Sequence, residues 1–113
     1  MCSSDLFKGP VAILTSGLTI SAGETFTQAM MGRRPAVFRV GEPTQGVFSD
    51  VLSRQLPNGF EFGLPNEVFR AEDGRTFDGP GIPPTHPVPV FSAADRARAR
   101  DGALEKALEL TGR

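Results

Sequence analysis

The chain has 113 residues, 39% of them hydrophobic, and a formal net charge of −1 at pH 7. Such a chain fills one small domain, and its charge predicts no attraction to nucleic acids or to membranes. No apolar run approaches the roughly 20 residues that cross a bilayer. The single cysteine, Cys2, excludes an internal disulfide and a multi-cysteine zinc site.

The first six residues, MCSSDL, differ in character from the rest of the chain. Their Cys-Ser-Ser-Asp-Leu stretch can be encoded by the tail of a common sequencing adapter fused to a gene fragment. We therefore interpret residues 1–6 as a non-native leader and leave them out of the fold prediction. On this interpretation the natural protein begins further upstream, and the chain is its C-terminal piece.

The first predicted elements are a strand and a helix joined by a turn. Residues 11–14 (VAIL) are continuously apolar, as in a strand covered on both faces, and Gly17 ends the run. Residues 22–31 show apolar residues at helical spacing, and Gly32 is placed to end this helix in a left-handed conformation.

A second strand and two hairpins are predicted next. Residues 35–41 (PAVFRVG) read as a short strand, which completes a βαβ unit with a right-handed crossover. Asn58-Gly59 between apolar-rich runs is a strong hairpin signal. A second hairpin is predicted around residues 71–74 (AEDG).

The last part of the chain is predicted to be a loop and a helix. Residues 78–90 (DGPGIPPTHPVPV) hold too many glycines and prolines for a helix or a central strand. Ser92 and Asp95 fit a capping box at the start of a final helix. The apolar stripe of that helix is expected at Ala94, Ala97, Leu104, Ala107 and Leu108. The fold class is therefore α/β, with β-α-β followed by hairpins and a C-terminal helix.

Ser21 stands where the first strand gives way to the helix, and two roles fit it. With Glu24 it matches the S-x-x-E capping box, in which the serine caps free N–H groups and the glutamate reaches back. A hydroxyl at a helix N-terminus also lies beside unpaired N–H donors and the positive end of the helix dipole, which stabilise a developing oxyanion. The tetrapeptide alone leaves both a cap and a nucleophile open.

A serine nucleophile needs a base, and this chain offers few. His86, the only histidine, lies among prolines in the predicted loop, which favours a packing role. Lys8 and Lys106 lie near the two ends of the chain. Glu24 and Glu42 are the closest carboxylates, and we expect them to act as a capping partner and a turn residue.

Other site classes are disfavoured. Ile20 and Thr19 before Ser21 do not match the G-x-S-x-G elbow of α/β hydrolases. No metal-ligand spacing and no phosphate-binding glycine loop is present, so no metal and no cofactor are expected.

Four stretches resemble, in order and spacing, the tail-specific or C-terminal processing serine peptidases: GPVAILTSGLTISAGETF, VFRVGEPTQG, LPNGFEF and NEVFRAEDGRTFDGPGIPP. The resemblance is greatest to the branch with tricorn-like peptidases and the repeats of interphotoreceptor retinoid-binding protein. It runs from about Gly9 to Val90. We therefore assign residues 7–91 to the C-terminal part of a tail-specific protease domain and residues 92–113 to a C-terminal helix. The implied fold is a crotonase-like core.

The resemblance also implies roles for single residues. Ser21 corresponds to the nucleophile, and the backbone N–H of Ala22 to half of the oxyanion hole. Val47 stands where the Ser-Lys members carry their lysine, so that mechanism fails here. In the tricorn-like branch a histidine from the earlier half of the domain is the base, and an acidic residue completes the set. Asp78 stands at the acidic position, with a shorter reach than glutamate.

We therefore predict a serine-type peptidase that acts on a peptide or protein through an acyl-enzyme at Ser21. The base and the second oxyanion donor are expected in an N-terminal half-domain outside this chain, so the chain alone is expected to be inactive. Two alternatives stay open: a non-catalytic ligand- or peptide-binding domain in which Ser21 is only a cap, and a piece that does not fold alone. Relatives are often exported, periplasmic or membrane-associated in bacteria.

Overall fold

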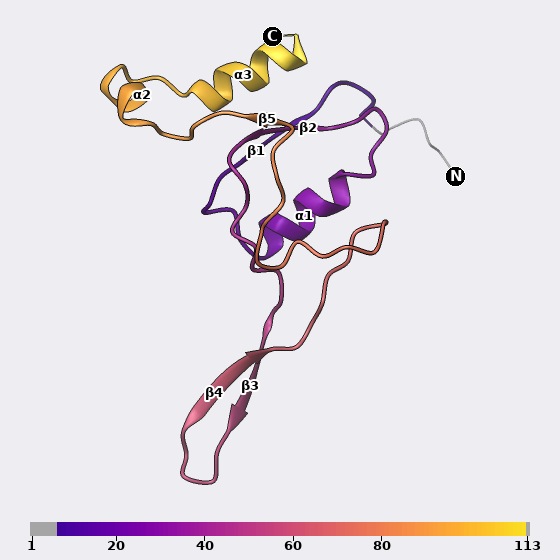
Figure 1. Ribbon diagram of the computed structural model, residues 1–113, viewed down its shortest axis with the longest axis vertical. Helices are drawn as coiled ribbons and strands as arrows, with labels where there is room; N and C mark the ends of the chain where they lie inside the picture. The colour runs from indigo at the N-terminus through magenta and orange to yellow at the C-terminus, as the bar shows by residue number, and fades with distance from the viewer. Residues whose placement is uncertain (1–6, 113) are drawn as a thin grey trace.

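The computed structural model describes residues 7–112, so the interpretation of residues 1–6 as a leader lies outside the described residues. The fold is mixed α/β, as predicted (Figure 1). Among residues 7–112, no helix combines the length and the apolar character that crossing a membrane demands. In chain order the elements are β1 (Ala12–Thr15), α1 (Ala22–Met30), β2 (Phe38–Gly41), β3 (Val51–Gln55), β4 (Glu61–Pro65), β5 (His86–Pro87), α2 (Ala93–Ala97) and α3 (Gly102–Thr111).

The predicted βαβ unit is confirmed. β1 and β2 pair in parallel, from Ala12 opposite Phe38 to Thr15 opposite Gly41, and α1 connects them. The third strand, β5, pairs in parallel with β2, which gives the order β1-β2-β5. The prediction that residues 78–90 form only a loop is therefore wrong at β5. Proline is tolerated there because β5 is an edge strand and can leave a backbone donor out of the ladder.

The first core lies between the sheet and α3. Val40 of β2 is fully buried against Ala103 and Ala107 of α3, which lie one helical turn apart. Small alanine side chains let the helix approach the sheet closely. The expected cover over both faces of β1 is not provided by the described residues, because Leu14 is 45% exposed.

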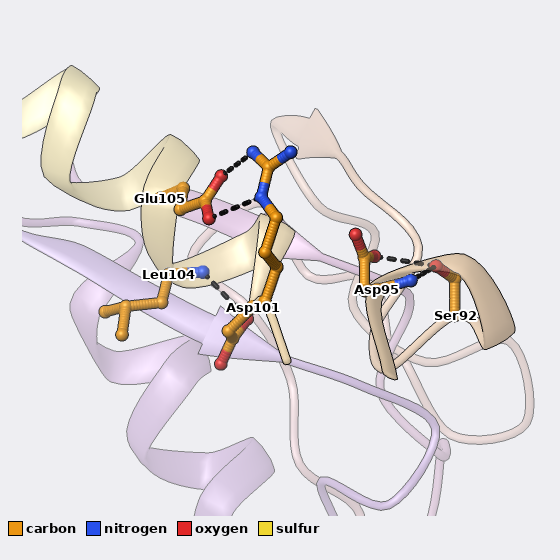
Figure 2. Close-up of polar contacts among 6 residues, drawn as sticks. Ser92, Asp95, Asp101, Leu104 and Glu105 are labelled. Atoms are coloured by element: carbon orange, nitrogen blue, oxygen red, sulfur yellow. Dashed lines mark hydrogen bonds and ion pairs between the residues drawn. The ribbon is translucent and has the colours of Figure 1, made fainter. Parts of the chain in front are cut away.

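The C-terminal segment forms two helices where one was predicted. Ser92 accepts a hydrogen bond from Asp95 N and caps α2, as the capping-box pattern indicated, and Asp101 accepts one from Leu104 N and caps α3 (Figure 2). The helical conformation is interrupted between them at Ala99, whose φ of 51° lies outside the right-handed helical region. The predicted apolar stripe is also wrong in part, because Leu104 and Leu108 are exposed, whereas Ala107 is buried.

The hairpin predicted at Asn58-Gly59 is confirmed. β3 and β4 pair antiparallel, and Gly59 adopts a φ of 87° in the connecting turn. All residues of both strands are exposed, and the hairpin projects away from the rest of the chain (Figure 1). The second predicted hairpin is wrong: residues 71–74 form a turn closed by Ala71 N to Arg75 O at 2.9 Å, but no strands flank it.

A second core joins the loop after β2 to the segment that follows the turn at residues 71–74. Phe48, Phe77 and Ile82 are buried together, with Met31 and Phe69 packed against them. These contacts place residues 44–48 beside residues 77–82.

Two polar contacts hold the same two segments together. Thr44 Oγ1 accepts a hydrogen bond from Ile82 N at 2.7 Å, and Gly46 O accepts one from Gly79 N at 2.8 Å. The loop that carries Asp78 is thereby fixed next to the loop that follows β2.

Candidate active site

Ser21 lies on a sharp turn between β1 and α1. Its dihedrals, φ 53° and ψ −117°, are those of the second residue of a type II′ turn, a position that glycine dominates. The turn is closed by a hydrogen bond from Gly23 N to Ile20 O at 3.0 Å. A serine in this region stores strain on the order of 1–3 kcal/mol, and such strain clusters at functional sites.

The capping-box prediction for Ser21 and Glu24 is wrong. The Ser21 side chain makes no capping hydrogen bond, although its carbonyl oxygen accepts from the N–H groups of Glu24 and Thr25. The Glu24 side chain points elsewhere. The predicted left-handed end of α1 at Gly32 is also wrong, because the helix is capped by Met31 with φ −64° and Gly32 has no positive φ.

The Glu24 carboxylate instead binds the loop after β2. Its two oxygens accept hydrogen bonds from Gly46 N and Val47 N, each at 2.7 Å, and the residue is fully buried. Hydrogen bonds to an ionised acceptor are about twice as strong as neutral ones. Glu24 therefore ties the first turn of α1 to residues 46–47.

The same loop also contacts Ser21 directly. Ser21 N donates to Val47 O at 2.9 Å, and Gln45 N donates to Thr19 O at 2.9 Å. Residues 19–21 thus lie alongside residues 45–47, and these two bonds fix the backbone that presents the Ser21 hydroxyl.

Asp78 reaches the far end of this loop. Its Oδ1 accepts from Phe48 N at 3.4 Å, and its Oδ2 accepts from Thr76 Oγ1 at 3.3 Å. The side chain is half-buried. The structure thus brings Ser21 and Asp78 to one segment, residues 46–48, although no hydrogen bond joins the two among residues 7–112.

Ala22 is the first residue of α1 and is exposed. Within the described part of the chain its N–H group donates to no acceptor. The first N–H groups of a helix are unsatisfied by the helix itself, and together with the dipole they favour an anion. The donor therefore lies beside Ser21 and is available to an oxyanion.

The remaining candidates from the sequence lie elsewhere. His86 packs its ring edge-on against Phe38, with centroids 5.5 Å apart, and its Nδ1 lies 3.0 Å from Thr85 Oγ1. Glu42, expected as a turn residue, accepts a hydrogen bond from Val90 N at 3.0 Å. No hydrogen bond joins either residue to Ser21 in the described chain.

Neither lysine forms an ion pair or hydrogen bond with Ser21 among the described residues, and these residues hold no metal-binding cluster. Lys106 pairs with Glu109 on α3, at 2.9 Å, and Lys8 is exposed. Residues 7–112 contain no group of three His, Cys, Asp or Glu side chains with the spacing of a metal site.

Sequence reasoning missed the partner of Glu24 and the backbone conformation of Ser21. The only signal for the first was a glutamate three residues after a serine, and a capping box has the same pattern. For the second there was none, because a serine rather than a glycine occupies the turn.

Residues 3–88 match the family model of peptidase family S41, and the chain belongs to this family. The matched span includes part of the segment interpreted as a leader, which stays a prediction. No curated protein matches the chain.

Solved structures agree with this fold. The chain is 27% identical to a candidate peptidase from Parabacteroides merdae, with a TM-score of 0.79. The match covers 90% of this chain and 31% of the peptidase. Mature CPAF, solved with lactacystin, is 20% identical with a TM-score of 0.75 over 96% of this chain and 21% of CPAF. A lipoprotein from Streptococcus agalactiae is 21% identical, with a TM-score of 0.56. That match covers 80% of this chain and 30% of the lipoprotein.

The chain thus spans about a third or less of each of these solved proteins. It has the fold of a part of an S41 peptidase.

Proposed function

We propose that this chain carries the nucleophile of a serine-type peptidase, and that Ser21 is that nucleophile. One observation carries the proposal: a non-glycine residue is held in a type II′ turn at a helix N-terminus, with its hydroxyl uncommitted to capping. A serine that served only as a cap would accept a hydrogen bond from the first turn of α1.

The chemistry follows from this placement. Ser21 Oγ attacks the carbonyl carbon of a peptide bond while a base takes its proton, and the carbonyl oxygen becomes an oxyanion. The N–H of Ala22 and the positive end of α1 stabilise that charge. The intermediate then collapses to an acyl-enzyme as the amine leaves with a proton, and water releases the acid.

We further propose that Asp78 orients the base, as the third member of the set. The base and the second oxyanion donor come from the preceding half of the domain, outside this chain. The lysine that serves as the base in the Ser-Lys members is absent, because position 47 is valine. Loss of a general base costs on the order of 10² or more in rate, so the chain alone is expected to be inactive.

A covalent probe tests the nucleophile. In the full-length parent protein, a fluorophosphonate should label Ser21, identified by peptide mass, and Ser21→Ala should abolish the labelling. The matched control is Ser92→Ala, which removes a serine that also precedes a helix but caps it in the ordinary way. Equal labelling of the Ser21→Ala protein would refute the proposal.

The alternative is a binding domain of the same fold that takes a peptide or another ligand without cleaving it. The valine at position 47 favours it, because it removes the base of the Ser-Lys members. It predicts binding of a peptide by the parent protein with no labelling at Ser21. The same experiment therefore separates the two functions.

A further inference from the structure

We propose that Glu24 is a positioning residue that holds the segment from Gly46 to Phe48 in the arrangement that catalysis requires. The inference rests on the proposed function, because it concerns how Ser21 and Asp78 are held relative to each other. Glu24 itself touches no reacting atom; it acts through the backbone of the segment.

Residues 46–48 hydrogen-bond to three residues of the site: Gly46 N and Val47 N donate to the Glu24 carboxylate, Val47 O accepts from the backbone N–H of Ser21, and Phe48 N donates to the Asp78 carboxylate. A shift of this short segment therefore moves the support of Ser21 and the anchor of Asp78 together.

Two backbone N–H groups side by side need two acceptor atoms, and a carboxylate supplies both. A glutamine side chain supplies one oxygen, and its NH₂ group would face the second N–H donor. Glu24→Gln therefore keeps the shape of the side chain but breaks one of the two hydrogen bonds at 2.7 Å.

A fully buried carboxylate is retained at the expense of its hydration, and replacing buried ionic groups by apolar ones is often neutral or favourable for stability. The dipole at the start of α1 offsets part of this cost. A role in holding a catalytic geometry accounts for a charge that stability alone does not require.

The test uses the full-length parent protein and compares Glu24→Gln with the wild type. We expect kcat per folded molecule to fall on the order of 10-fold to 100-fold, because small misplacements of catalytic groups have effects of this size. KM should change by less than about 3-fold, since no substrate contact is removed. The folded fraction is measured by circular dichroism in the same samples.

Glu42→Gln is the matched control. Glu42 is also a carboxylate that accepts a hydrogen bond from a backbone N–H, that of Val90, but within the described residues no hydrogen bond joins it to residues 46–48. It should leave kcat unchanged. If Glu24→Gln also leaves kcat per folded molecule within 2-fold of the wild type, Glu24 is only structural and the proposal is overturned. If Glu24→Gln does not fold, Glu24→Asp, which keeps both oxygens on a shorter arm, is measured by the same criterion.

Hydrogen exchange keeps the test independent of activity. The amides of Gly46 and Val47 should exchange faster in Glu24→Gln than in wild type, while Glu42→Gln should leave them unchanged. Unchanged exchange at both amides overturns the proposal, whatever the activity. A wild-type protein that neither cleaves peptides nor labels at Ser21 refutes the proposed function instead, and with it the catalytic purpose assigned to Glu24.

Discussion

At the scale of single residues, the backbone of Ser21 is the most informative feature of the chain. Its φ of 53° places a side chain where glycine is the usual residue, and the hydroxyl gains no capping bond in return. The local strain is therefore not explained by stability. A strained, uncommitted serine beside an available N–H group supports the proposal that Ser21 is a nucleophile.

We predict that Ser21→Gly raises the free energy of unfolding by about 1 kcal/mol. Removing Cβ relieves strain of about 1–3 kcal/mol, and the greater freedom of glycine in the unfolded chain offsets part of the gain. Ser21→Ala keeps the strain and loses no cap, so its stability should stay within about 0.5 kcal/mol of wild type. Urea unfolding measures both. A loss of about 1 kcal/mol in Ser21→Ala would restore the cap interpretation.

A second prediction at this scale concerns Gly46, which has a φ of 83° and lies against backbone. A Cβ atom there would lie 2.5 Å from Gly79 O, so the segment would have to move. Gly46→Ala should lower the free energy of unfolding by more than about 2 kcal/mol, since strain and overpacking add. Gly74→Ala is the control, because Gly74 also has a positive φ, 82°, but has open space around it. Equal losses would mean that crowding at Gly46 plays no part.

At the scale of elements, the β3–β4 hairpin has two unlike faces. Leu52 lies opposite Leu64, and Arg54 opposite Phe62, and these side chains share one face because strands alternate. The other face is mixed, because Val51 and Pro65 lie there beside polar side chains. A two-stranded hairpin without packing partners is marginally stable in water, so an exposed apolar face of this kind favours association.

We predict that Phe62→Lys reduces self-association of the chain. Phe62 is 40% exposed on the apolar face, and a charge there opposes edge-to-edge and face-to-face contact. Gln55→Lys, on the opposite face, adds the same single charge and is the control, which should change association much less. Static light scattering over a concentration series measures the effect. Equal suppression by both variants would mean that net charge, rather than the apolar face, governs association.

At the scale of the whole molecule, the two cores and the exposed hairpin imply unequal local stability. Val40 and Ile82 are fully buried, whereas the strands of the hairpin are exposed throughout. Segments with few buried contacts open at a lower free energy. The candidate site lies beside the second core, where residues 44–48 meet residues 77–82.

We predict that hydrogen exchange, followed by mass spectrometry, is slowest in β2 and in residues 44–48 and fastest in β3 and β4. The reason is that Val40 and Gly41 of β2 and Thr44, Gly46 and Phe48 are buried, whereas every residue of the hairpin strands is exposed. Uniformly fast exchange over all segments would show instead that the chain does not hold a stable fold alone, which is the second alternative left open by the sequence.

Much of this architecture could be predicted because it is encoded locally. The VAIL run gave β1, the Asn-Gly pair gave the hairpin, and Ser92 with Asp95 gave the start of α2. The predictions were wrong where the structure depends on residues that are distant in the sequence or interrupts a regular sequence pattern. The break at Ala99 splits a continuous helical pattern, and β5 exists only because β2 offers an edge to pair with.

The sequence by itself determined the α/β class, the βαβ unit and the position of Ser21 at the start of α1, because apolar spacing and turn residues act over a few positions. Only the tertiary structure decided the partner of Glu24, which lies 22 residues away at Gly46. It also decided the backbone of Ser21 and the meeting of Asp78 with Phe48. These depend on packing between distant segments, which closes a geometry that no local pattern specifies.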